Sequence, residues 1–198
     1  MKKRKINWVS TAALLLLLLV LPLGSWFYLK KGFDYQLQAR SELKDYGRLP
    51  SFSFRTETGD TFSDRDVDDR TLVAGFLTTE QLRNHEDLRN HIFQLNSQFF
   101  DREEMLLLTF LRDGEDLSPT QLAQLENELQ LKNTEQWYLL SGSASEIQRV
   151  ERAFAFPEGS NPQFALVDSL TIRNYYDATD PARAGRLAEH LAIILPAE

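Results

Sequence analysis

Cysteine is absent from this chain of 198 residues. Its absence excludes disulfide bonds, thiolate metal ligands, thiol redox chemistry, cysteine nucleophiles and a lipid anchor on a cysteine. Three common motifs are also missing: the sequence has no G-x-S-x-G nucleophile turn, no P-loop and no G-x-G-x-x-G dinucleotide fingerprint. The function classes that are easiest to identify from a sequence therefore have no support here.

Acidic residues are absent from the first 31 positions, which hold six of the 22 basic residues. The rest of the chain has 16 basic and 29 acidic side chains. Nucleic-acid phosphates require basic groups, so we expect no nucleic-acid partner for a domain this acidic. Hydrophobic residues make up 42% of the chain and charged residues 26%, which predicts one globular domain with an appendage.

The N-terminal segment has the pattern of a membrane anchor. A basic cluster at residues 2–5 precedes the uncharged stretch 6–29, which as a helix would be about 36 Å long and could cross a hydrocarbon core of about 30 Å. Trp8 and Trp26 stand near its two ends, where interfacial aromatic residues are common. More basic residues precede the stretch than follow it. We therefore expect residues 1–31 to be a cytoplasmic tip and a membrane anchor. The rest would be extracytoplasmic, on the periplasmic side of the inner membrane in a bacterium.

A cleaved signal peptide is the alternative, because it begins with the same basic cluster. Its apolar region usually spans about 7–15 residues and ends in a small-x-small site. The apolar run here is longer, and Leu23-Gly24-Ser25 is a weak cleavage site, so we expect the anchor to stay attached. Residues 32–48 show no clear core pattern and are interpreted as a juxtamembrane spacer, partly helical.

Residues 49–198 alternate between strand-like and helix-like patterns. Phenylalanines on both sides of the turn Thr58-Gly59-Asp60 predict a β-hairpin. Apolar runs predict buried strands at residues 71–78, 105–111, 137–140 and 164–167. A turn near residues 168–170 then leads into a hairpin partner that carries Ile172, Tyr175 and Tyr176.

Helical spacing of apolar residues predicts four helices among and after these strands. Their inward faces are Leu88, Ile92, Leu95 and Phe99; Leu122, Leu125 and Leu129; Ile147, Val150 and Phe154; Leu187, Leu191 and Ile194. Helix-start signals are Ser118-Pro119, the capping box Ser143/Glu146, and Asp180-Pro181. The order of elements predicts a mostly parallel, mixed central sheet with flanking helices, an α/β three-layer sandwich of thioredoxin-like type.

Five stretches between residue 49 and the end of the chain have the order and spacing of one family's motifs. They are residues 49–62 (LPSFSF through GDTF), 72–79 (LVAGFLTT), 109–122 (TFLRDGEDLSPTQL), 136–142 (QWYLLSG) and 164–181 (FALVDSLTIRNYYDATDP). Together they resemble the Sco/SenC family of membrane-anchored, thioredoxin-like copper proteins of cytochrome oxidase assembly. The resemblance implies the same fold and the same membrane topology.

The resemblance also implies where a copper site would lie. Family members bind copper through two cysteines in C-x-x-x-C-P, after the first central strand, and through a distant histidine. The cysteine positions fall on Glu80 and Asn84, and His85 replaces the proline. The region of the distant histidine holds Ser160, Asn161 and Pro162. Soft thiolates select Cu(I), and a carboxylate and an amide do not imitate them, so we expect neither copper delivery nor a cofactor.

For the histidines and Pro162, a purely structural role is an alternative to a role in a functional site. His85 and His91 are six residues apart, which does not place them on one helical face. With Glu80 they could form a weak zinc site, but no third imidazole is close in sequence. His190 is expected on the surface of the last helix. Pro162 is placed like the cis-proline of thioredoxin active sites, and an ordinary trans proline in a loop is the alternative.

Two acidic clusters also have ordinary interpretations. The aspartates at positions 64, 66, 68 and 69 lack the EF-hand spacing, so a solvated loop is expected rather than a calcium site. The carboxylates at 103–104 and at 113, 115 and 116 flank the second central strand. Acid–base chemistry is open to them in principle, but no nucleophile accompanies them.

The sequence therefore predicts a membrane-tethered Sco-like domain that is not an enzyme. The resemblance implies that it acts by binding, as an accessory factor among oxidase subunits or assembly factors. The expected partner surface is the former active-site edge, formed by the loops Thr79–His85 and Gly159–Pro162. Two alternatives stay open: a rebuilt metal or catalytic site near Glu80, His85 and Asn161, and a purely structural scaffold.

Overall fold

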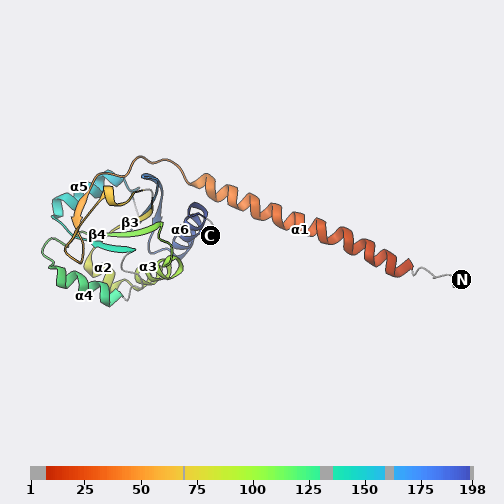
Figure 1. Ribbon diagram of the computed structural model, residues 1–198, viewed down its shortest axis with the longest axis horizontal. Helices are drawn as coiled ribbons and strands as arrows, with labels where there is room; N and C mark the ends of the chain where they lie inside the picture. Colours follow the sequence, from red (N-terminus) through yellow and green to blue (C-terminus); the bar gives the residue numbers. More distant parts are fainter. Residues whose placement is uncertain (1–7, 69, 130–135, 159–162, 197–198) are drawn as a thin grey trace. The chain divides into compact units, whose positions relative to one another are not determined.

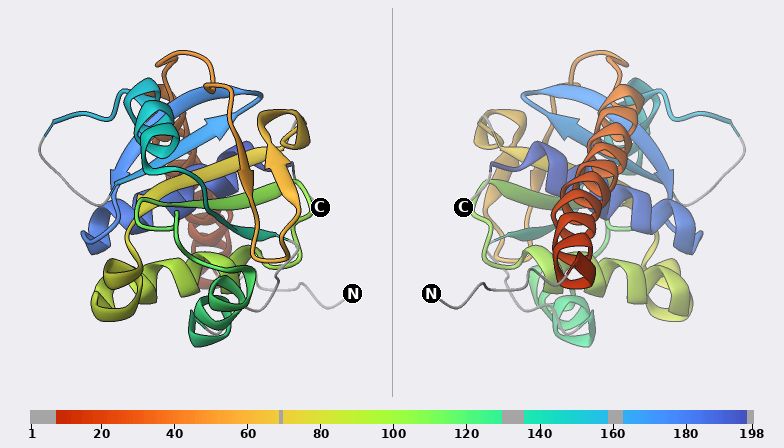
Figure 2. Two further views of the ribbon diagram at one scale, coloured as in Figure 1. Left: turned by 90° about the vertical axis from the view of Figure 1, so that its left-hand side faces the viewer. Right: turned by 90° about the vertical axis from the view of Figure 1, so that its right-hand side faces the viewer.

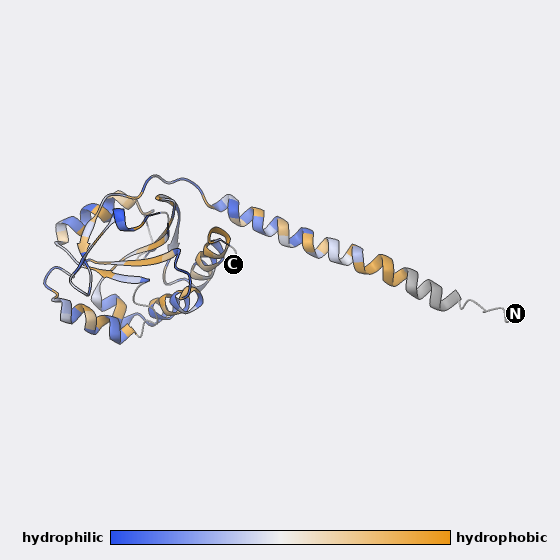
Figure 3. Cartoon of the chain, viewed as in Figure 1, coloured by the Kyte–Doolittle hydropathy of each residue, from blue (hydrophilic) through white to orange (hydrophobic). Residues whose placement is uncertain are grey.

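The computed structural model describes residues 8–68, 70–129, 136–158 and 163–196. The chain divides into two compact units, Met1–Ser41 and Glu42–Glu198. Most of the first unit belongs to the helix α1, which runs Trp8–Glu42 (Figure 1). Within the described residues one helical stretch, Leu16–Glu42, is long and apolar enough to cross a membrane. Its leucines from Leu16 to Leu29 are exposed in the isolated chain, and Figure 3 shows the apolar colouring of this part of α1.

The segment interpreted as a spacer, residues 32–48, has two parts. Its first part continues α1 to Glu42, because residues 32–42 contain no proline and include good helix formers. Its second part lies in the second unit and pairs with β7 (Thr171–Asp177). The N–H groups of Lys44 and Tyr46 donate to the carbonyls of Arg173 and Ile172, at 3.0 and 2.9 Å. The last residues of this segment therefore cover one edge of the sheet.

The central sheet has five strands in the order β5-β4-β3-β6-β7. The strands β3 (Thr71–Leu77), β4 (Met105–Leu111) and β5 (Trp137–Leu140) are parallel to one another. The strand β6 (Gln163–Asp168) is antiparallel to β3, and β7 is antiparallel to β6. Every residue of β3 and β4 is buried, as the continuous apolar runs predict for strands covered on both faces.

Four helices cover one face of this sheet: α2 (Thr79–Asn84), α3 (Glu86–Phe99), α4 (Pro119–Leu129) and α6 (Pro181–Ile194). The other face is covered by α5 (Ala144–Phe154) and by the hairpin of β1 (Ser53–Arg55) and β2 (Thr61–Ser63), which is followed by the short helix η1 (Asp64–Asp66). Figure 2 shows the two layers around the sheet.

Alternate residues of β3 supply the two cores, because neighbouring strand residues point to opposite faces. Val73 and Leu77 pack beneath the helices α3 and α6, whereas Leu72 and Phe76 pack against the hairpin and α5. The predicted three-layer thioredoxin-like sandwich is thus confirmed, and its strands and its longer helices lie close to the predicted positions.

Candidate functional site

The carboxyl end of β3 leads directly into α2, where the sequence was interpreted as a loop. This interpretation was wrong, because Thr78 and Gln81 form a capping box that starts a helix. The Thr78 hydroxyl accepts from the Gln81 N–H at 3.1 Å, and the Gln81 side-chain oxygen accepts from the Thr78 N–H at 2.9 Å. The T-x-x-Q spacing at positions 78–81 is the signal that could have identified it.

A carboxylate that follows β4 accepts hydrogen bonds from the first residue of α2. Asp113, two residues after β4, accepts from the Thr79 N–H at 2.9 and 3.1 Å and from the Thr79 hydroxyl at 2.6 Å. Helix starts present N–H groups without partners in the helix, together with the positive end of its dipole. Here the chain satisfies them with its own carboxylate.

A second carboxylate of the same loop has the same role. Glu115 accepts from the N–H of Ala144, the first residue of α5, at 3.0 Å. Directly before these two residues, Arg112 pairs with Glu151 of α5 at 2.5 Å. Two of the carboxylates that follow the second central strand are therefore structural caps of neighbouring helices. The contacts of Asp113 and Glu115 are those of helix caps rather than of acid–base groups.

The residues at the positions of the family's cysteines lie on the outer surface of α2. Glu80 and Asn84 are four residues apart, which places them on one side of a helix, and both are exposed. His85 is also exposed, and it lies at the junction of α2 with α3. Arg83 pairs with Glu128 of α4 at 2.9 Å, which holds α2 against its neighbour.

These residues do not fit copper. Glu80 and Asn84 offer hard oxygen donors in water, and Cu(I) requires soft donors such as thiolates. Within the described residues no group of three or more histidine, aspartate or glutamate side chains could hold a metal ion. Ser160, Asn161 and Pro162 lie outside the described residues. The structure thus gives no geometry for the second half of the predicted partner surface.

The other singled-out residues have structural contacts. The Nδ1 atom of His91 lies 2.9 Å from the carbonyl oxygen of Ala178, so this ring links α3 to the loop before α6. The acidic segment, expected as a loop, begins with the short helix η1, and Asp64 accepts from the Phe52 N–H at 3.2 Å. Asp66 accepts from the hydroxyl and the N–H of Ser63, and these bonds lower the pKa of its carboxyl. Both aspartates therefore fix the hairpin.

The prediction for His190 was wrong: the side chain is fully buried in α6. Its Nδ1 atom lies 2.5 Å from the hydroxyl of Tyr176 on β7, and its Nε2 atom lies 3.5 Å from a carboxylate oxygen of Glu42. Burial raises the pKa of the Tyr176 hydroxyl. Arg186 pairs with the same Glu42 carboxylate at 2.7 Å. His190 stands three residues after Leu187 on the buried face, and this spacing could have predicted its position.

Sequence analysis also missed two neighbouring carboxyl groups, one buried and one half-buried, near the tip of the hairpin. Glu57, 7% exposed, accepts from the Leu139 N–H of β5 at 3.2 Å. Burial raises the pKa of Glu57. Burial and the charge of Glu57 raise the pKa of Glu126 on α4. The polarity of both residues suggested a surface, and only the packing of the hairpin tip on α4 brings them together.

Known structures with the same fold include Sco proteins. The chain is similar to BsSco, a member of the Sco family of cytochrome c oxidase assembly proteins, with 19% identity over 79% of this chain and 97% of that chain (TM-score 0.64). A SCO1/SenC family lipoprotein from Bacillus anthracis has 18% identity over 77% of this chain and 98% of that chain (TM-score 0.65).

The fold is shared more widely. The thioredoxin domain of a thiol-disulfide oxidoreductase from Bacteroides vulgatus matches with 12% identity over 78% of this chain and 99% of that chain (TM-score 0.57). No protein-family model and no curated protein matches the sequence. The comparisons therefore establish the thioredoxin-like fold that the Sco proteins have.

Proposed function

We propose that this chain is a membrane-anchored, cysteine-free relative of the Sco proteins, which acts by binding a protein partner in cytochrome c oxidase assembly. It is neither an enzyme nor a copper carrier. One observation carries the proposal: the helix at the position of the family's copper loop is capped by Thr78 and Asp113. The residues exposed on it and at its end are Glu80, Arg83, Asn84 and His85. Such a surface can bind a protein, but it supplies no soft metal ligand and no thiol.

The assembly context is taken from the Sco proteins with the same fold. A fold alone does not fix a function, so the support comes from the combination of this fold with an apolar N-terminal helix. In the proposed topology α1 remains attached as the anchor, the basic residues 2–5 are cytoplasmic, and the domain is extracytoplasmic.

Site-specific photocrosslinking in intact membranes tests the proposal. A photoreactive residue replaces Glu80 on α2 in the full chain, and a matched variant carries it at Glu103, an exposed position in the turn before β4. We expect an oxidase subunit or an assembly factor among the adducts of position 80 and not among those of position 103. The same adducts at both positions, or none at position 80, would contradict the binding role and favour a structural scaffold.

The copper part of the proposal has its own measurement. The full chain is purified in detergent, loaded with Cu(I) under reducing conditions and dialysed against a Cu(I) chelator. We expect no stoichiometric copper to remain. Stoichiometric retention that is lost in Glu80→Ala combined with His85→Ala would instead establish a rebuilt metal site.

A further inference from the structure

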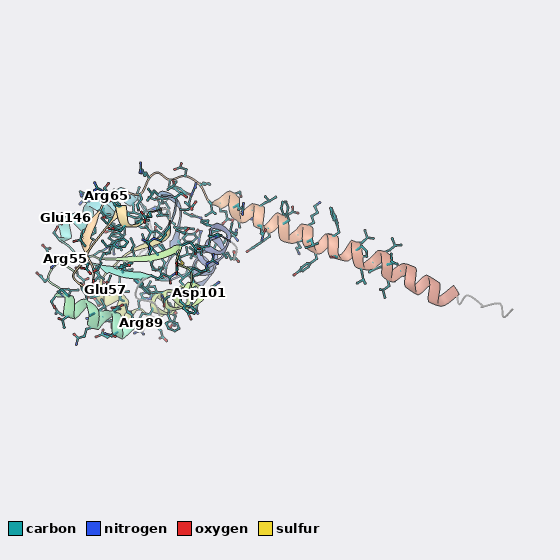
Figure 4. The ribbon with its side chains drawn as sticks, viewed as in Figure 1. Arg55, Glu57, Arg65, Arg89, Asp101 and Glu146 are labelled. Atoms are coloured by element: carbon teal, nitrogen blue, oxygen red, sulfur yellow. The ribbon has the colours of Figure 1, made fainter. Side chains whose placement is uncertain are left out.

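A groove lies on the face of the sheet that is opposite to α2. It encloses about 430 Å³ between the hairpin and α5. Ser51 and Ser53 line it on the β1 side, Arg65 of η1 lies at its rim, and Glu146 and Arg149 of α5 form the other wall. Figure 4 labels Arg65 and Glu146 on this side of the molecule. Its volume would hold a segment of a few residues.

The β1 wall of the groove is a strand edge at which one residue, Ser53, has no backbone partner among the described residues. Arg55 exchanges two backbone hydrogen bonds with Ser141, at 3.0 and 2.8 Å, on the side of β1 away from β2. Alternate residues of an antiparallel strand direct their N–H and C=O groups to the same side. Ser53 therefore presents both groups to the groove. Neither has a hydrogen-bond partner among the residues that the structure describes.

The edge is open because the neighbouring strand ends too early to cover it. After Ser141 the chain turns through Gly142, and α5 begins at Ala144. Gly142 passes directly over the hairpin: a Cβ atom there would lie 2.5 Å from Cδ1 of Phe54. The chain thus leaves the sheet beside Arg55, and α5 faces the uncovered edge across the groove instead of pairing with it.

Two carboxylates and two guanidinium groups line the groove. The carboxylates are hydrogen-bonded within the chain, because Asp64 accepts from the Phe52 N–H and Glu146 accepts from the Ser143 hydroxyl at 2.7 Å. Arg65 and Arg149 form no ion pair with the described residues; Arg149 makes only a 3.5 Å contact to the carbonyl of Ser51. The two guanidinium groups are therefore the charged groups of this groove that can pair with a carboxylate of an occupant.

We propose that this groove binds an extended, acidic segment of a partner polypeptide, which pairs with Ser53 as an added strand and places its carboxylates on Arg65 and Arg149. An extended chain fits better than a free anion, because only a backbone offers both a donor and an acceptor to the strand edge. The groove uses no residue of the α2 surface, so the inference stands independently of the proposed function.

Nuclear magnetic resonance of the labelled full chain in detergent micelles tests it. The probe is a capped six-residue peptide in which two glutamates alternate with valine and threonine. We expect saturable binding, with slower hydrogen exchange at the Ser53 amide. Arg65→Gln combined with Arg149→Gln should raise Kd at least tenfold. The same charge change at Arg89 and Arg183, which lie on other helices, should leave Kd unchanged.

Four outcomes would overturn the proposal. The first is the absence of binding at millimolar peptide, and the second is equal affinity for the peptide with glutamine in place of both glutamates. The third is an unchanged Kd in the double arginine variant, with its fold verified by the amide spectrum. The fourth is binding of inorganic phosphate that perturbs the arginines while the peptide leaves the Ser53 amide unaffected, which would indicate a free-anion site.

Discussion

The start of α2 and the groove beside β1 are two places where the chain brings backbone N–H groups to the end of an element. At α2 these groups are bonded to Thr78 and Asp113 of the chain itself. At the groove the N–H and C=O of Ser53 have no partner among the described residues, although hydroxyl groups and arginines surround them. The helix start at the position of the Sco copper loop has its N–H groups bonded within the chain. The edge of β1 instead leaves the N–H and C=O of Ser53 available to a ligand.

The largest effect is expected from introducing two cysteines on α2, because they would give this helix a Cu(I) site. We expect Glu80→Cys combined with Asn84→Cys to gain one Cu(I) per chain under reducing conditions, because thiolates four residues apart share one side of α2. The measurement is copper retained by the full chain in detergent against a Cu(I) chelator, compared with wild type.

Glu80→Cys combined with His85→Cys is the matched control. It also carries two thiols, but position 85 lies outside α2, at its junction with α3, so the pair does not share one side of the helix and should retain much less copper. Equal retention in the two variants would show that the helix does not position the thiols, and the α2 surface would then lack the geometry inferred here.

Gly142→Ala tests the packing of the chain after β5 against β1, beside the groove. The added Cβ would meet the Phe54 ring at 2.5 Å, so the buried ring must shift, and such overpacking costs about 1–3 kcal/mol of unfolding free energy. Urea denaturation measures the loss, and Gly32→Ala on α1, where a Cβ meets nothing within 4 Å, is the control. A stability equal to wild type would mean that the hairpin is free to move away from β5.

Removing the carboxylate at α2 should have a smaller effect. Asp113→Ala takes the acceptor from the Thr79 N–H and hydroxyl, and the loss of a helix cap costs about 1 kcal/mol. Asp113→Asn keeps an acceptor and should recover part of the loss. Asp116→Ala in the same loop is the control, and an Asp116→Ala effect as large as that of Asp113→Ala would contradict the capping role.

The strands and long helices could be predicted because the local spacing of apolar residues indicates which side chains are buried. The runs at β3 and β4 are apolar throughout, and Ser143 with Glu146 marks the start of α5. The contacts of the two compared regions could not be predicted in this way. Asp113 meets Thr79 across 34 residues of sequence, and the exposure of Ser53 depends on where β5 ends. His190 was misplaced because its polarity outweighed its place on the buried face of α6.

The smallest expected effect concerns Glu57, whose carboxylate accepts from the Leu139 N–H of β5. Burial raises its pKa above the ordinary value of 4.5, so the folded state holds the proton more tightly than the unfolded state. The contribution of Glu57 to the free energy of unfolding is therefore fully present at pH 4 and declines as the pH rises through the raised pKa.

Glu57→Gln keeps an acceptor for the Leu139 N–H and does not ionise. The variant should match wild type at pH 4 and exceed it modestly at pH 8 in urea denaturation, whereas Glu103→Gln at an exposed position should match wild type at both. An advantage of Glu57→Gln that is equal at the two pH values would mean that the ionised carboxylate is not penalised by burial, and the β5 edge would then be as accessible to water as the groove beside it.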